Sequence, residues 1–316
     1  MRLEEKIKQY GISATLRTYA QSGILIYAIF VFLFVRKNKT GLEQFRDIMN
    51  NKLFYKLYKK NRKIIDNAQH QTLENDSAIP RKIWFCWMQG IANAPELVQA
   101  CFNRLKVVLN NYEINVITKD NYKDFTNLPD FITKKWEKNI ITTTHFSDIL
   151  RNNLLLNNGG YWIDSTVFLS DSIPEIIQKS QFFLFQSYKP GSNGKEVNLS
   201  SWFIGSIKNN PVLKLTQELL FNYWKKKNYL IDYFLYHNFL QMALNHYHEI
   251  KKQIPKYTNE TAHYLLFELQ NDFNITKYTD ICGQIFAHKL TYKLPEFFDK
   301  EKTGTYYKYI VDNNKK

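Results

Sequence analysis

A chain of 316 residues exceeds the length of a small domain but is usual for a single α/β enzyme. Its aromatic content of 16% excludes intrinsic disorder for most of the chain. The formal charge of +14 favours anionic partners, namely nucleic acid, an acidic lipid leaflet or phosphorylated substrates. Lysines are scattered, and no zinc-finger or aromatic RNA-binding motif occurs, so we expect no nucleic-acid partner. Three cysteines without a CxxC pair indicate neither a disulfide framework nor a zinc site, and favour the cytoplasm.

The N-terminal segment contains an uninterrupted apolar run, Gly23 to Val35, that is followed by Arg36, Lys37 and Lys39. It is shorter than the roughly 18 residues that a spanning helix needs. It starts late and lacks a small-residue cleavage site, so a secretory signal is not expected. Three interpretations stay open: a buried helix, an interfacial anchor, or a short spanning helix extended back to Tyr19. The basic residues after it suit an anionic leaflet, so we predict a helical, membrane-associated extension over residues 1–75.

The chain changes character near Ile79-Pro80, where we place the start of a second unit over residues 76–300. The apolar run 83–87 predicts a buried strand, apolar residues at helical spacing predict a helix over 95–109, and the alternation over 112–118 predicts a second strand. A strand, a helix and a strand in this order predict a parallel α/β sheet. Neither a G-x-G-x-x-G motif nor a Walker lysine loop is present, so dinucleotide and ATP-type phosphate loops are not expected.

The most informative stretch is THFSDILRNNLLLNNGGYWIDSTVFLS, residues 144–170. Its first half has the apolar spacing of a helix, on which Asp148 and Arg151 share one face. Gly159 and Gly160 end that helix. A strand is predicted from Tyr161 to Leu169, with Asp164 part-way along it. If the strand ends near Asp164, its carboxylate lies at the edge where open α/β sheets bind ligands.

Three segments together resemble the capsular polysaccharide synthesis family of glycosyltransferases, which is related to the DXD-containing, mannosyltransferase-like sugar transferases. They are I-P-R-K-I-W…W…G from residue 79, P-E-L-V…C-F from residue 95, and S-D-I-L-R…G-G-Y-W-I-D from residue 147. The resemblance covers roughly residues 79–295. It implies a GT-A-like nucleotide-sugar-binding fold with a mixed central sheet, and transfer of a sugar from a nucleoside diphosphate donor with retention of configuration.

The resemblance also assigns roles to residues. Asp164 would be the first carboxylate of the DXD motif and a ligand of Mn²⁺ or Mg²⁺, but Ser165 and Thr166 follow it, so the second carboxylate is missing. Donor binding would involve Asp148 and Arg151, as well as other residues listed here: Trp84, Trp87, Gly159, Gly160, Ser165 and Lys289. Independently of the resemblance, Asp148 with Arg151 can be a simple helix ion pair.

Further segments resemble the family downstream. Ser201 and Trp202 would lie on the acceptor side, although Trp202 can equally be core. Asp232, in D-Y-F, would act at the anomeric carbon or the acceptor, or else is a helix N-terminal charge. In the H-K-L-T segment, His288 would complete the metal shell and Lys289 would hold the diphosphate. Residues 301–316 are expected to form a polar, frayed tail.

These patterns predict a hexosyltransferase that uses a UDP- or GDP-sugar and a lipid-linked oligosaccharide acceptor in surface polysaccharide synthesis. We expect it at the cytoplasmic face of a bacterial membrane, held peripherally or by its N-terminus. Two alternatives stay open: a sugar-phosphate transferase, which would release a nucleoside monophosphate, and a non-catalytic glycan-binding assembly protein.

Overall fold

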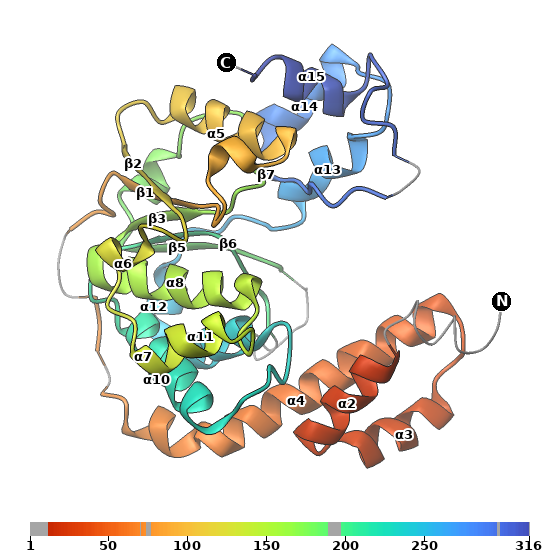
Figure 1. Ribbon diagram of the computed structural model, residues 1–316, viewed down its shortest axis with the longest axis vertical. Coiled ribbons are helices and arrows are strands. Elements are labelled where there is room, and N and C mark those ends of the chain that lie inside the picture. Colours follow the sequence, from red (N-terminus) through yellow and green to blue (C-terminus); the bar gives the residue numbers. More distant parts are fainter. Residues whose placement is uncertain (1–11, 70, 74–76, 189–196, 296–297, 316) are drawn as a thin grey trace.

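The N-terminal extension is a helical hairpin followed by one long helix in the computed structural model, which describes residues 12–69, 71–73, 77–188, 197–295 and 298–315 (Figure 1). Its helices are α2 (Ile12–Ser22), α3 (Leu25–Phe34) and α4 (Lys39–Asn67). Asn38 begins α4 by accepting a hydrogen bond from the Gly41 N–H. The helical character predicted for residues 1–75 is therefore present from Ile12 onward, and residues 1–11 lie outside the described part.

The centre of the molecule is a mixed five-stranded sheet with strand order β2-β1-β3-β6-β5. Strand β1 is parallel to both β2 and β3, whereas β6 is antiparallel to β3 and β5. The strands are β1 (Lys82–Cys86), β2 (Glu113–Ile117), β3 (Gly160–Ile163), β5 (Phe182–Gln186) and β6 (Leu199–Ser206). The predicted α/β class with a mixed central sheet is confirmed.

Side-chain alternation along the strands separates two hydrophobic layers. On one face, Trp84 and Trp162 join the core under α8 (Thr143–Asn158), α10 (Pro211–Lys226) and α11 (Leu235–His246). On the other face, Phe85 and Tyr161 pack towards α5 (Glu96–Val108). The shorter helices are η1 (Ile91–Asn93), α6 (Tyr122–Phe125), α7 (Asp130–Glu137), α9 (Glu175–Gln178) and α12 (His248–Gln253).

The first core also includes the N-terminal extension. Leu53, Phe54 and Leu57 of α4 are buried in the same cluster as α10 and α11. Asn222 of α10 donates a hydrogen bond to Asn61 of α4 over 3.0 Å. The extension is therefore packed onto the α/β unit along α4.

A second, two-stranded sheet pairs β4 (Val167–Leu169) with β7 (Ala287–Lys289) in antiparallel fashion. The register places Lys289 opposite Val167 and His288 opposite Phe168. Around this sheet lie η2 (Thr261–His263), α13 (Tyr264–Glu268), α14 (Ile275–Gln284) and α15 (Tyr306–Asp312). The strand predicted over 161–169 is thus two strands, separated by a turn at Asp164.

The C-terminal segment differs from the predicted frayed tail. Residues of α15 are buried, and they form a third core with α5 and α13. Thr305 begins the helix by accepting a hydrogen bond from the Lys308 N–H. The sequence contains four apolar or aromatic residues at helical spacing that are buried here: Tyr306, Tyr307, Ile310 and Val311. The prediction from overall polarity was therefore wrong for this segment.

Candidate active site

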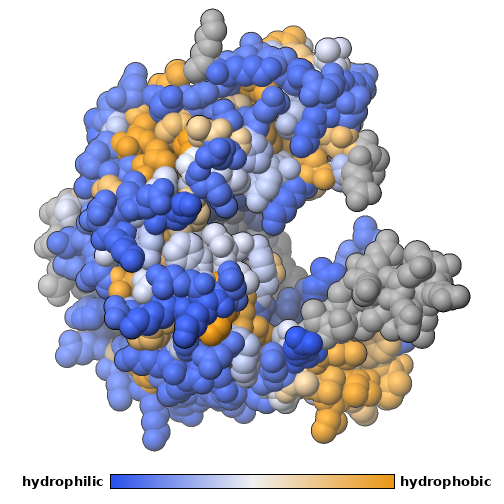
Figure 2. Space-filling model, in the orientation of Figure 1, coloured by the Kyte–Doolittle hydropathy of each residue, from blue (hydrophilic) through white to orange (hydrophobic). Residues whose placement is uncertain are grey.

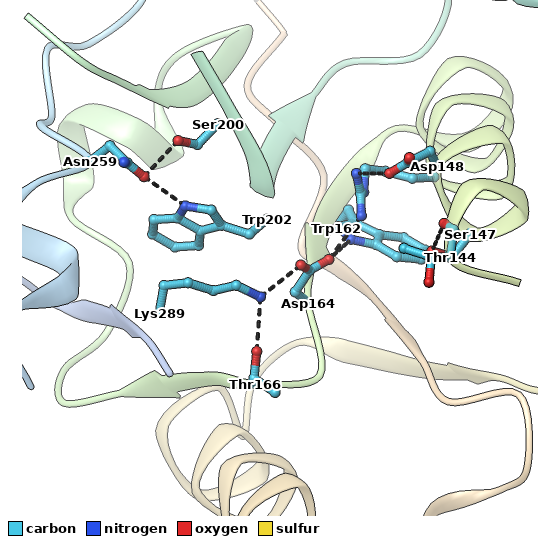
Figure 3. A network of polar contacts seen from close by, with 11 residues as sticks. Thr144, Ser147, Asp148, Trp162, Asp164, Thr166, Ser200, Trp202, Asn259 and Lys289 are labelled. Atoms are coloured by element: carbon cyan, nitrogen blue, oxygen red, sulfur yellow. Dashed lines mark hydrogen bonds and ion pairs between the residues drawn. The ribbon is translucent and has the colours of Figure 1, made fainter. Parts of the chain in front are cut away.

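Asp164 lies at the end of β3, in the turn that leads to β4. The parallel strands β1, β2 and β3 end at this same edge of the sheet, which is where α/β proteins place their ligands. Its Oδ1 accepts hydrogen bonds from Trp162 Nε1 over 2.7 Å and from Arg151 Nη2 over 2.9 Å. Its Oδ2 accepts one from Lys289 Nζ over 2.8 Å (Figure 3). The carboxylate is therefore held by three donors, two of them cationic.

Arg151 connects Asp164 to Asp148. Its Nη1 donates to Asp148 Oδ1 over 2.8 Å, while Nη2 reaches Asp164. The guanidinium is buried and lies over the rings of Trp162 and Tyr236, at 4.8 and 5.6 Å from their centroids. The predicted shared face of Asp148 and Arg151 is present, and Arg151 holds both carboxylates at once.

The charges of this network shift its pKa values. Burial alone would raise the pKa of Asp164, but Lys289 and Arg151 outweigh it and hold the pKa below the ordinary value. Burial is likewise outweighed at Asp148, where Arg151 and a hydrogen bond with His145 lower the pKa. Both carboxyl groups are therefore ionised at neutral pH.

Lys289 is the cation that faces outward from this network. Its Nζ donates to Asp164 Oδ2 and to Thr166 Oγ1, each over 2.8 Å. An ammonium group has three N–H donors, so one is left by these two bonds. The side chain is 22% exposed and lines a pocket of about 650 Å³.

That pocket lies between the α4 helix of the extension and the α/β unit. Figure 2 shows the molecule hollowed on the side where these two parts face each other. The volume of the pocket is in the range of small-molecule binding sites. Polar and aromatic residues from distant segments line it, among them Asp47, Asn50, Asn51, Phe54, Ser200, Trp202, Asp232, His237, Asn238, Asn259, His263 and Lys289.

Trp202 is fixed in the pocket wall by hydrogen bonding. Its Nε1 donates to Asn259 Oδ1 over 2.9 Å, and Ser200 Oγ donates to the same oxygen over 2.6 Å (Figure 3). One ring face stacks on Phe185, with centroids 4.3 Å apart. Ser201 lies between two residues that face the pocket and does not line it, because neighbouring strand residues point to opposite faces. The serine that lines the pocket is thus Ser200, and the structure does not bring Ser201, the predicted residue, to the pocket.

Asp232 lies just before α11 and also lines the pocket. Its two oxygens accept hydrogen bonds from the Phe234 N–H and from Asn238 Nδ2. Burial raises its pKa, and these two bonds only partly offset the increase. The position in the pocket is therefore present, whereas the Asp232 side chain does not cap α11, whose N-cap residue is Phe234. Burial also lowers the pKa of the neighbouring His237 to about 4.

Three residues predicted to bind the donor, Trp84, Gly159 and Gly160, are buried in the packing of the sheet and do not lie with Asp164 and Lys289. Trp84 is 1% exposed, and its Nε1 donates to the Gly159 carbonyl, so it is a core residue. Gly159 and Gly160 have φ angles of +68° and +99°, which favour glycine. A Cβ on Gly160 would lie 2.5 Å from the Lys82 carbonyl oxygen. Both glycines therefore serve the packing of β3. Ser165 lies in the turn after Asp164 and has only partial exposure.

Trp87, in contrast, lies just beyond the end of β1, at the ligand-binding edge. Its ring meets Tyr292 edge-on, with centroids 5.4 Å apart. Its Nε1 is buried and has no hydrogen-bond partner among the described residues. A buried N–H without a partner costs free energy, so a ligand that placed a hydrogen-bond acceptor atom beside Nε1 would bind more tightly.

His288 does not join Asp164, although Lys289 does. Adjacent residues of β7 point to opposite sides, and His288 Nε2 lies 3.0 Å from Ser170 Oγ in a fully buried position. Burial lowers its pKa to about 4. The structure therefore corrects its predicted place in a metal shell.

The residues around Asp164 do not fit a divalent cation. Both carboxylate oxygens already accept N–H donors, and the nearest charged neighbours, Arg151 and Lys289, are cations that repel a metal ion. Within the described ranges, no group of three His, Cys, Asp or Glu side chains is arranged to hold a metal.

Comparison with known proteins assigns the chain to a family. The family model described as "Capsular polysaccharide synthesis protein" matches residues 30–310. The chain belongs to the capsular polysaccharide synthesis protein family. This confirms the resemblance found in the sequence and extends it to all of α4 and to parts of α3 and α15.

A solved structure titled "PaToxG Glycosyltransferase" is similar to this capsular polysaccharide synthesis protein at 16% identity and a TM-score of 0.39. The match covers 66% of this chain and 80% of that one. A search of curated protein sequences gave no significant match.

Several site residues were missed in the sequence. Trp162 had a usable signal, because it lies two positions before Asp164 and a strand places residues i and i+2 on one side. Asn259 and His263 follow no motif, and Asn50 and Asn51 belong to a helix that was treated as a separate extension. Only the tertiary packing brings these residues to the pocket.

Proposed function

We propose that this protein is a glycosyltransferase that moves a hexose from a UDP- or GDP-sugar to a lipid-linked oligosaccharide during capsule synthesis. Membership of the capsular polysaccharide synthesis family supports the biological context. The observation that carries the chemistry is Lys289, which is fixed by Asp164 at the ligand-binding edge of the sheet and lines a polar pocket. The protein has three free cysteines, Cys86, Cys101 and Cys282, which agree with a cytoplasmic location.

The leaving group needs positive charge. As the bond between the anomeric carbon and the β-phosphate oxygen breaks, a full negative charge develops on the nucleoside diphosphate. Lys289 would donate its remaining N–H to that diphosphate, and Asp164 and Thr166 hold the ammonium group in place. Arg151 is buried and already bonded to two carboxylates, so it supports Asp164 and does not bind the diphosphate directly.

The donor base is proposed to bind near Trp87. The unpaired Trp87 Nε1 is a donor for a base or ribose oxygen, and Tyr292 beside it provides an aromatic edge. Asp148 is buried behind Arg151 and is 8% exposed. We therefore assign Asp148 to positioning Arg151, and not to contact with the donor.

The acceptor is proposed to enter the pocket beside α4. Trp202 provides an aromatic wall, while Asn50, Asn51 and Asn259 provide amides that suit sugar hydroxyl groups. Asp232 carries carboxylate oxygens at the same pocket, and we assign it to accepting a hydrogen bond from the acceptor hydroxyl.

Retention of configuration is what the family resemblance implies, and the engagement of Asp164 then favours a front-face route over a covalent intermediate. With three donors on its two oxygens, Asp164 is a poor nucleophile for a covalent intermediate. In a front-face reaction, the acceptor oxygen bonds to the anomeric carbon as the diphosphate leaves, and a phosphate oxygen takes the hydroxyl proton. NMR of the product linkage tests this. An inverted product would instead give Asp232 the role of general base.

The deciding experiment incubates the full chain with a panel of UDP- and GDP-sugars and a lipid-linked glycan extract, and identifies the nucleotide released. Release of a nucleoside diphosphate from one donor, with labelled sugar in the lipid fraction, supports the proposal. Release of a nucleoside monophosphate would indicate a sugar-phosphate transferase. Glycan binding without any turnover would identify a non-catalytic assembly protein.

A further inference from the structure

The α3 helix carries an apolar stripe on its outer side. Five side chains at spacings of three and four residues are strongly exposed: Ile26 (85%), Ile29 (54%), Phe30 (60%), Leu33 (71%) and Phe34 (74%). Figure 2 shows hydrophobic residues gathered over the region that α3 occupies in Figure 1. A helix on the surface of a soluble protein normally turns its polar residues outward, so this stripe is an unpartnered binding surface.

The inner side of α3 is already buried, so the exposed stripe is not left over from a loosely packed helix. Ala28 is 3% exposed, and Phe32 packs edge-on against Phe45 of α4 with centroids 5.5 Å apart. The turn before α3 is fixed by Lys56 Nζ, which donates to the Gly23 carbonyl over 2.8 Å. The helix is therefore held on α2 and α4 with its apolar stripe facing outward.

Basic residues surround this stripe. Lys52 of α4 lies over the Tyr27 ring at 4.5 Å from its centroid, and Lys37 lies over Phe32 at 3.7 Å. Arg36 and Lys39 follow α3 directly. From residue 12 to 67 the chain has eleven Lys or Arg and only three Asp or Glu, so the apolar surface lies within a strongly positive region.

We propose that the outer face of α3 and its basic surroundings dock this protein onto an anionic lipid bilayer, as an interfacial helix. A helix of ten residues is roughly 15 Å long, about half the thickness of the hydrocarbon core. In the described part of the chain, no helix is long and apolar enough to cross a membrane. At a bilayer surface, the apolar side chains of α3 would enter the boundary between headgroups and acyl chains. The surrounding lysines would contact the acidic headgroups, so both the apolar stripe and the positive charge would have a partner.

A second copy of the chain is a poorer occupant. Two such surfaces in contact would bring the same positive charges together in a protein whose formal charge is already +14. Anionic lipid supplies the opposite charge. Docking would also place the pocket next to the bilayer, because Asp47, Asn50 and Phe54 of the adjoining α4 helix line it. The lipid-binding inference does not depend on the proposed reaction.

The test is vesicle flotation of the full chain with phosphatidylcholine vesicles, and with vesicles that also contain phosphatidylglycerol. The variant replaces Ile26, Phe30 and Leu33 by serine. The matched control replaces three equally exposed apolar residues elsewhere by serine: Val107 (64%), Ile176 (62%) and Phe267 (70%). Because all six side chains are exposed, both variants should fold, and circular dichroism melting checks this.

We expect the wild type and the control to float with the anionic vesicles, and salt to weaken binding. The α3 variant should lose at least about tenfold in partitioning, because each buried apolar side chain contributes to interfacial binding. Equal flotation of the α3 variant, or no flotation of the wild type, would overturn the proposal. So would a dimer in sedimentation analysis that the α3 variant alone disrupts. Turnover of a detergent-soluble acceptor should be the same in all three proteins, which separates this test from the proposed reaction.

Discussion

Lys289 Nζ lies 2.8 Å from Asp164 Oδ2, although 125 positions separate the two residues in the chain. Pairing of β7 with β4 brings them together, because the register sets Lys289 opposite Val167, three residues after Asp164. The ion pair therefore joins the end of the central sheet to the C-terminal part of the molecule, and it leaves a positively charged group facing the pocket.

Replacing Lys289 should therefore slow catalysis more than it weakens substrate binding. Lys289→Ala removes the charge proposed to stabilise the leaving diphosphate, and we expect kcat to fall by about 10²- to 10³-fold. Steady-state release of the nucleoside diphosphate measures this. Lys289→Arg should recover part of the rate, because it keeps the charge but not the geometry.

Lys179→Ala is the matched control for that series. Lys179 is 75% exposed and pairs with Glu175 on the surface, so its loss should leave kcat unchanged. A Lys289→Ala enzyme with a native melting temperature and unchanged kcat would remove Lys289 from the mechanism.

Chelation should have little effect on turnover. Asp164 is held between two cations, and this donor set does not favour a divalent ion. We expect the rate with EDTA to stay within about twofold of the rate with Mn²⁺, because Lys289 provides the charge that a metal would otherwise supply. A rate that EDTA abolishes and Mn²⁺ restores would show that the donor rearranges the Asp164 network on binding.

Burial of His288 predicts a pH dependence of stability. Its pKa is lowered to about 4 in the folded protein from an ordinary value of 6.5. Between these pH values the unfolded chain binds a proton that the folded chain does not. The free energy of unfolding should therefore keep its full value, as far as His288 is concerned, above pH 6.5. It should fall as pH decreases towards 4, by up to about 1.4 kcal/mol per pH unit from this residue.

Chemical denaturation at several pH values compares the wild type with His288→Asn, which keeps an amide near Ser170. The variant should lose part of the slope between pH 6.5 and 4. His248→Asn is the control for the substitution itself, because His248 is 63% exposed on the surface. An unchanged slope in His288→Asn would contradict the assignment to this histidine.

Gly160 should be required for folding and not for donor binding. A Cβ at this position would lie 2.5 Å from the Lys82 carbonyl oxygen, at a φ of +99° that disfavours other residues. We expect Gly160→Ala to destabilise the protein by several kcal/mol, on the order of 3 or more, or to prevent folding. Gly283→Ala, in α14 with no atom within 4 Å of the new Cβ, should stabilise by about 0.5–1 kcal/mol. A well-folded Gly160→Ala protein with a raised KM for the donor would restore the original assignment to the donor site.

Local sequence patterns were sufficient for the parts of the site that lie close together in the chain. The helix with Asp148 and Arg151, the glycine turn and Asp164 follow one another within seventeen residues, so spacing alone placed them. The first strand was also located correctly, but the direction of its side chains was not. Trp84 lies in the strand and faces the core, whereas Trp87 lies just past its end.

The remaining parts depend on tertiary packing that no local pattern contains. The order β2-β1-β3-β6-β5, the meeting of Lys289 with Asp164, and the α4 wall of the pocket all join distant segments. The sequence could have predicted that His288 and Lys289 face different sites, because two neighbouring strand residues point to opposite sides. A family motif placed both residues there, and the alternation of the strand shows that only one of them reaches it.

The α4 helix separates the proposed lipid-binding surface of α3 from the pocket. Phe45, Lys52 and Lys56, which contact α3 or the turn before it, lie on one side of α4. The pocket residues Asp47, Asn50 and Phe54 lie on the opposite side of the same stretch. This stiff spacer, roughly 10–12 Å thick with its side chains, sets how far above the lipid headgroups a growing glycan presents its end to the pocket. Turnover measured on lipid-linked acceptors of increasing glycan length should pass through an optimum, and an enzyme indifferent to that length would show that the spacer sets no such distance.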